Sequence, residues 1–211
     1  MNIQFITIGA DCSPAAALRE LNLRQFALPF DWVQTNVHNL KLCFHDNFEK
    51  YHQTLKLNNT KTRLVDTYGF QFPHDYPFTG ECDDADFTNA IGEYFPEIRT
   101  KTIIPNWHDF HHIAIEKYQR RIERFNNIMN ESSNIIIMLC RYPPSSAIQI
   151  KNMLQSHYHR ENIFVINSNR TEHFDTNNKI LHIHTEKNNK WNDSVIWNDA
   201  INKMKEIIHA K

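Results

Sequence analysis

A cysteine stands where the first predicted strand turns into a helix. Cys12 follows the largely apolar residues 3–8 and Gly9, and it directly precedes Ser13-Pro14 and a run of helix-forming residues. The dipole and the free N–H groups of a helix start favour a thiolate, and they can hold the oxyanion of a tetrahedral intermediate. Cys12 therefore has the position of a nucleophile elbow, with Cys in place of Ser. Spacing alone leaves two interpretations open, a nucleophile or a buried cysteine that closes a turn.

A thiol nucleophile needs a base within hydrogen-bond reach, and two histidines are candidates. His74 lies between Pro73 and Pro77, which stiffen the backbone of an otherwise irregular region. His108 begins a predicted helix, where the dipole disfavours a protonated ring. A base that becomes imidazolium during acyl transfer is better placed away from a helix start. We therefore predict His74 as the base, with His108 as its competitor.

Two groups of histidines raise the question of a metal site. Residues 107–112 contain three histidines and one aspartate, and His182 and His184 alternate along a predicted strand. Solvated imidazoles explain the first group, and a solvent-facing strand edge explains the second. A metal site also needs ligands on one face and partners that orient them. We predict no bound metal and no cofactor.

The elements that must position these residues alternate between strands and helices. This order predicts a three-layer α/β fold with a mostly parallel, Rossmann- or SGNH-like sheet in a single domain, 1–211. Residues 56–112 break the pattern and are interpreted as a long irregular insertion or lid, with short strand-like pieces at 64–65 and 70–72 and an acidic loop at 81–86. The apolar segment 28–32 is expected to pack against the domain. The predicted strands are 3–8, 135–140, 163–166 and 180–184, and the predicted helices are 13–21, 36–51, 113–129, 145–157 and 194–209, with Ser13 and Asp193 as caps.

Composition excludes several classes of function. The chain has 211 residues, a net charge of −1 and only 4 Gly, and it contains no glycine-rich nucleotide motif. No apolar run reaches the roughly 18 residues that span a bilayer, and the first ten residues are not those of a signal peptide. We expect a cytoplasmic protein that binds neither nucleic acid nor membrane, with its thiols reduced. The four cysteines form no CxxC pair and stand at 12, 43, 82 and 140.

Several segments together resemble a known family. Gly9-Ala10-Asp11-Cys12 is followed by two Leu-Arg pairs, by Pro29-Phe30-Asp31-Trp32 and by KYQRRIERF at residues 117–125. This order is similar to that of bacterial and viral proteins described as putative papain-like cysteine peptidases, whose pattern also includes a histidine motif, HDF. His74-Asp75-Tyr76 aligns best with that motif, although residues 107–110 offer a second match. The resemblance spans about residues 5–142.

The resemblance implies that Cys12 is the nucleophile and His74 the base, and we prefer Asp31 of the PFDW segment as the orienting carboxylate. It also implies a thiol-dependent hydrolase that cleaves an amide or ester bond in a peptide, ester or glycan substrate. The predicted β-α units favour a flavodoxin-like sheet rather than a papain fold. They keep open an acyltransferase that moves an acyl group from a donor such as acetyl-CoA to a sugar hydroxyl. A binding domain in which Cys12 is only structural is the third alternative.

Overall fold

The structure is a computed structural model that describes residues 2–79, 102–185 and 193–210. Its centre is a five-stranded sheet in the order β1-β5-β6-β8-β7. The first four strands in that order are parallel, and β7 pairs antiparallel with β8 at one edge. The strands are β1 (Asn2–Thr7), β5 (Asn134–Cys140), β6 (Ile163–Ser168), β7 (His173–Asp175) and β8 (Ile180–Ile183).

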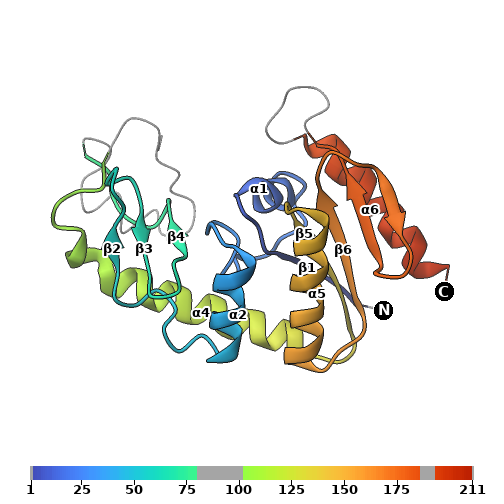
Figure 1. The fold of residues 1–211 in the computed structure, drawn as a ribbon, viewed down its shortest axis with the longest axis horizontal. Coiled ribbons are helices and arrows are strands. Elements are labelled where there is room, and N and C mark those ends of the chain that lie inside the picture. Colours follow the sequence, from blue (N-terminus) through green and yellow to red (C-terminus); the bar gives the residue numbers. More distant parts are fainter. Residues whose placement is uncertain (1, 80–101, 186–192, 211) are drawn as a thin grey trace.

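Helices cover both faces of this sheet, which confirms the predicted α/β class (Figure 1). On one face α1 (Ser13–Glu20) packs beside α6 (Ser194–His209). On the other face α2 (Val37–His45), α4 (His111–Asn130) and α5 (Pro144–Tyr158) enclose a larger core. Strands buried on both faces read as continuous apolar runs, and for this reason β5 and β6 are recognisable in the sequence.

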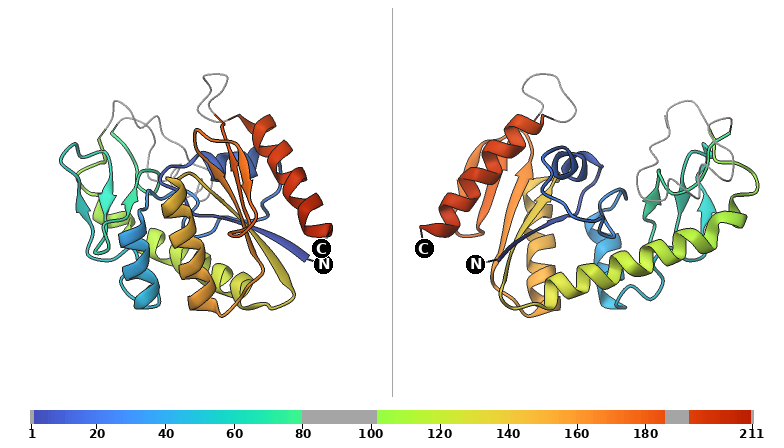
Figure 2. Two further views of the ribbon diagram at one scale, coloured as in Figure 1. Left: turned by 45° about the vertical axis from the view of Figure 1, so that its right-hand side comes forward. Right: turned by 180° about the vertical axis from the view of Figure 1, so that it is seen from behind.

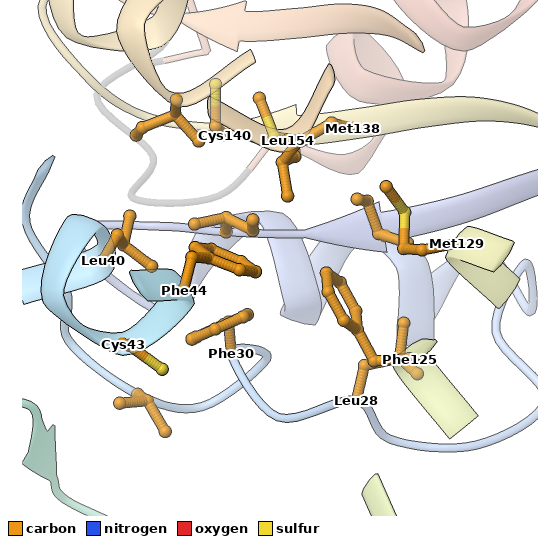
Figure 3. Close-up of a cluster of buried hydrophobic side chains, with 14 of the residues drawn as sticks. Leu28, Phe30, Leu40, Cys43, Phe44, Phe125, Met129, Met138, Cys140 and Leu154 are labelled. Carbon is orange, nitrogen blue, oxygen red and sulfur yellow. The ribbon is translucent and has the colours of Figure 1, made fainter. Parts of the chain in front are cut away.

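The larger core is unusually aromatic on the side of α2 and α4 (Figure 3). Phe30 of the PFDW segment meets Phe44, Phe48 and Phe125 with ring centroids 5.6–5.9 Å apart. The segment around Phe30 is buried, as the sequence predicts. Cys43 also lies in this core, fully buried and in a packing position.

Residues 36–51 do not form one helix as predicted. The helix α2 ends at His45, and Asn47 and Phe48 adopt left-handed backbone angles with φ of 54° and 67°. These turns bring Phe48 and Tyr51 into the aromatic core, so tertiary packing overrides the helical spacing of their side chains.

A second, smaller sheet is built by β2 (Lys56–Leu57), β3 (Leu64–Val65) and β4 (Gln71–Phe72). The three strands are antiparallel, and the sequence indicates only the last two. The carboxylate of Asp66 accepts hydrogen bonds from the N–H groups of His52, Tyr68 and Phe70 and so forms the turn that follows β3. The acidic loop predicted at 81–86 lies outside the described residues.

The small sheet lies over the first turns of α4, and the same helix continues beneath the large sheet (Figure 2). A separate apolar cluster joins the small sheet to α4 and to the 3-10 turn η1 (Trp107–Phe110). Its buried members include Leu64, Tyr76, Phe78 and Trp107. One continuous helix therefore links this cluster to the main core, to which Phe70 and Phe72 of the small-sheet region also belong.

Candidate active site

Cys12 lies at the carboxyl end of β1, at the start of α1. Gly9 makes the turn possible, because a Cβ atom there would come within 2.4 Å of the carbonyl oxygen of Asp11. Cys12 is the N-cap of α1, and the predicted cap Ser13 is instead its first residue. Asp11 fixes the turn, because its carboxylate accepts from the Ser13 N–H at 2.9 Å and pairs with Arg141 at 3.0 Å.

His74 lies beside Cys12, although 62 residues separate them in the chain. The Cys12 Sγ and His74 Nε2 atoms are 3.6 Å apart, within hydrogen-bond reach for sulfur. His74 follows β4 in the small sheet, and its ring packs against the Trp32 ring in a T-shaped arrangement with centroids 5.9 Å apart. The structure thus brings together the thiol and the histidine that the sequence proposes as nucleophile and base.

His108 is placed differently. It is exposed in η1 and stacks on the neighbouring Trp107 with ring centroids 3.6 Å apart. Within the described residues, no group of three or more His, Cys, Asp or Glu side chains could hold a metal ion. His182 is buried rather than solvent-facing, because it stacks on His173 and bonds to Asn169.

The electrostatics of the Cys12–His74 pair differ from the sequence prediction of a low thiol pKa. Burial, assisted by the charge of Asp11, raises the pKa of Cys12 to about 12, although Arg63 opposes the shift. Burial lowers the pKa of His74 to about 4, and the nearby Asp75 offsets only part of this shift. The prediction was wrong because desolvation outweighs the dipole of a two-turn helix. At neutral pH the pair is a thiol and a neutral imidazole.

The N–H groups at the helix start also differ from expectation. Asp11 already accepts from the Ser13 N–H, Pro14 has no N–H, and the Ala16 N–H bonds to the Cys12 carbonyl. Few donors of the first turn are therefore left to hold an oxyanion.

Asp31 is buried in a network of its own. Its carboxylate accepts from Thr7 Oγ1 at 2.6 Å, from Arg24 at 2.6 Å and from the Leu28 N–H at 2.8 Å. These bonds fix the PFDW segment against β1 and thereby place the next residue, Trp32, against His74. The structure gives Asp31 no hydrogen bond to His74, so its role as an orienting residue stays a prediction.

Asp75 bonds to α4 rather than to the His74 ring, and it anchors the histidine loop to that helix. The carboxylate accepts from Tyr118 Oη at 2.7 Å and forms a close ion pair with Lys117. Burial alone would raise the pKa of Asp75, but the charges of Lys117 and Arg121 hold it below its ordinary value. The KYQRRIERF motif of the sequence thus positions the histidine loop.

Sequence reasoning missed Arg63, which lies in the turn between β2 and β3. It donates from one guanidinium nitrogen to the side-chain oxygens of Gln34 and Gln71, the latter at 3.2 Å. Its positive charge opposes the rise in the pKa of Cys12 and adds to the fall in the pKa of His74. No local pattern distinguishes this arginine, because only the small sheet brings it to the site.

A family model described as "putative papain-like cysteine peptidase" matches residues 3–163. The chain belongs to this family. The matched region contains Cys12, the PFDW segment, His74 and the whole of α4. The chain is also 26% identical over 222 residues to "Uncharacterized protein R408" of Acanthamoeba polyphaga mimivirus, covering 97% of this chain and 86% of the viral one.

No solved structure matches the chain. In the described residues its sheet is mostly parallel, without the division into a helical half and a β-barrel half that a papain fold has. No helix in the described parts of the chain is long and apolar enough to cross a membrane.

Proposed function

We propose that this protein is a cysteine-dependent hydrolase that cleaves an amide or ester bond through a thioester intermediate on Cys12. The 3.6 Å approach of Cys12 Sγ to His74 Nε2 is the observation that carries the proposal. Membership of a family described as peptidase-like supports the same class of chemistry.

The pKa shifts favour general-base activation over a preformed thiolate–imidazolium pair. In this mechanism the neutral Nε2 of His74 accepts the thiol proton as Sγ bonds to the substrate carbonyl carbon. The imidazolium then gives that proton to the leaving amine or alkoxide, and the carbon–heteroatom bond breaks. His74 next takes a proton from water, the resulting hydroxide attacks the thioester, and Cys12 leaves and regains a proton.

Arg63 is our candidate for stabilising the oxyanion. A guanidinium has five N–H groups, and the two glutamine bonds use only one of its three nitrogens. Its positive charge also favours the thiolate that forms when the thioester breaks. In acyl transfer a substrate hydroxyl would replace water in the second step, with the same roles for Cys12 and His74.

The test compares Cys12→Ala and His74→Gln with the matched controls Cys43→Ala and His108→Gln. Substrates are a p-nitrophenyl ester, a fluorogenic peptide library, and acetyl-CoA with sugar acceptors. We expect both site variants to lose about 10³-fold or more in kcat, while the controls stay near wild type. Intact-mass spectrometry should find the mass of one added acyl group, and peptide mapping after digestion should locate it on the peptide that contains Cys12.

Alkylation of the native protein by iodoacetamide tests the activation mechanism. With a raised pKa, the labelling rate of Cys12 should still be increasing at pH 10, without a plateau near neutrality. Full activity in Cys12→Ala, or a wild-type protein that turns over none of the substrates and forms no acyl adduct, would refute the hydrolase. Acylated sugar in place of free acid would identify the transferase.

A further inference from the structure

The KYQRRIERF motif carries more positive charge than the contact with Asp75 uses. A cavity of about 420 Å³ lies between α4 and the chain that follows α1. Six cationic side chains line it, and no Asp or Glu does so in the described part of the chain. These side chains are Arg19, Arg24, Lys117, Arg120, Arg121 and Arg124.

We propose that this cavity, the arginine pocket, binds a phosphoryl group, either as a free inorganic anion or as part of a phosphorylated substrate or donor. Arg24 pairs with Asp31 and Lys117 pairs with Asp75, so the charges of these two cations are compensated within the protein. Arg120, Arg121 and Arg124 form no ion pair with any described carboxylate.

Arg121 adds a buried positive charge to the wall of this pocket. The side chain is only 5% exposed, and its Nη1 atom is buried without a hydrogen-bond partner among the described residues. The guanidinium lies 5.2 Å from the ring centroid of Tyr118, a contact that supplies no acceptor for Nη1. Because Nη1 itself is enclosed, an oxyanion in the pocket would be attracted by the charge of Arg121 rather than accept from this atom.

The number and type of the cations favour a phosphoryl group over a carboxylate. Guanidinium groups bind phosphate oxygens in a bidentate way, and a phosphoryl group offers three oxygens to several of them at once. A single carboxylate would leave most of the positive charge uncompensated. The volume lies in the range of small-molecule sites, so it can also hold part of the moiety that carries the phosphoryl group.

The arginine pocket adjoins the proposed active site. The guanidinium carbons of Arg19 and Arg24 lie 5.2 and 5.3 Å from the ring centroid of Trp32, and the same ring contacts His74. Arg19 also belongs to the helix that begins at Cys12. If the proposed function holds, a ligand anchored here would direct its acyl group toward the thiol.

Binding can be measured without turnover in the full-length Cys12→Ala protein by isothermal titration calorimetry. The probes are inorganic pyrophosphate, acetyl-CoA as an organic diphosphate, and acetate at equal ionic strength. We expect pyrophosphate or acetyl-CoA to bind and acetate not to bind. Tighter binding of acetyl-CoA would identify a phosphorylated organic ligand, and tighter binding of pyrophosphate a free anion.

The variants Arg120→Gln and Arg124→Gln, each in the Cys12→Ala background, should weaken binding by about tenfold each. Arg121→Gln should weaken it further, and circular dichroism checks that this buried variant folds. Arg170→Gln is the matched control, because it removes the same charge from an exposed turn between β6 and β7.

The proposal of a phosphoryl site would be overturned by equal affinity for the probes in Arg120→Gln, Arg124→Gln and Arg170→Gln. It would also be overturned if no phosphoryl probe gives binding heat at millimolar concentration. Either result leaves the hydrolase proposal intact, because that proposal depends on acylation of Cys12. Conversely, a wild-type protein that binds pyrophosphate but has no activity would support the phosphoryl site in the arginine pocket and refute the hydrolase proposal.

Discussion

The large sheet and the small sheet each contribute one member of the candidate pair, and they hold it by different means. Cys12 is placed by β1 and α1, whose apolar residues pack into cores on the two faces of the large sheet. His74 is placed by two-residue strands and by buried polar contacts, above all the ion pair of Asp75 with Lys117. The thiol therefore rests on hydrophobic packing, and the histidine depends on the packing of Phe72 together with a few electrostatic contacts.

This difference predicts that the small sheet opens more easily than the large one. Segments with short strands and a small core belong to the low-stability end of a native structure. Opening of the small sheet would separate His74 from Cys12 while leaving the nucleophile turn folded.

The largest expected effect comes from comparing one core aromatic residue in each region. Phe125→Ala should reduce the free energy of unfolding by about 3–5 kcal/mol, because Phe125 is fully buried beneath the large sheet. Trp107→Ala should mainly increase amide hydrogen exchange in residues 56–72, because Trp107 belongs to the separate cluster. Exchange that increases equally in β5 and β6 for Trp107→Ala would show that the two cores unfold as one.

Asp75→Asn removes the charge that compensates Lys117. We expect a loss of roughly 3 kcal/mol in the free energy of unfolding, because a buried ammonium is left without its counter-charge. Activity should fall as well, since the loop that holds His74 loses its anchor. Urea denaturation measures the first effect, and ester hydrolysis the second.

The double variant Asp75→Asn, Lys117→Met controls for the unpaired charge, because it removes both members of the pair. It should recover part of the stability that Asp75→Asn loses. If it is as unstable as the single variant, the ion pair is not what anchors the histidine loop.

The smallest expected effect is a dependence of stability on acid that originates in the small-sheet region. His52 is fully buried, and burial lowers its pKa to about 3. Below pH 6.5 this histidine binds a proton in the unfolded chain but not in the folded one. Its contribution to the free energy of unfolding is therefore fully present above pH 6.5 and declines on acidification. We expect His52 to contribute a loss of roughly 2–3 kcal/mol by pH 4.5.

His52→Gln should reduce this pH dependence, as measured by urea midpoints between pH 7 and 4.5. The slope that remains should include the contribution of His74, whose pKa burial also lowers. The exposed His209→Gln in α6 is the matched control and should retain the wild-type slope. An unchanged slope in His52→Gln would place the acid sensitivity elsewhere.

The sequence predicts the large sheet well because its signals are local. Buried parallel strands are continuous apolar runs, and Asp193 caps α6 with bonds from Val195 and Ile196, as its position indicates. The sequence did not predict the edge strand β7 or the strand β2. These strands have only two or three residues, partly exposed, and so few residues show no periodic pattern.

Sequence alone determined the α/β class, the strand-to-helix position of Cys12 and two candidate histidines for the base. Only the tertiary structure decided that His74 meets the thiol, that Arg63 joins them, and that Asp31 and Asp75 bond elsewhere. It also reversed the expected direction of the thiol pKa. The physical reason is that strands and caps depend on neighbours a few residues away. Burial and charge at a site depend on every segment packed around it, and here Cys12 and His74 are 62 residues apart in the chain.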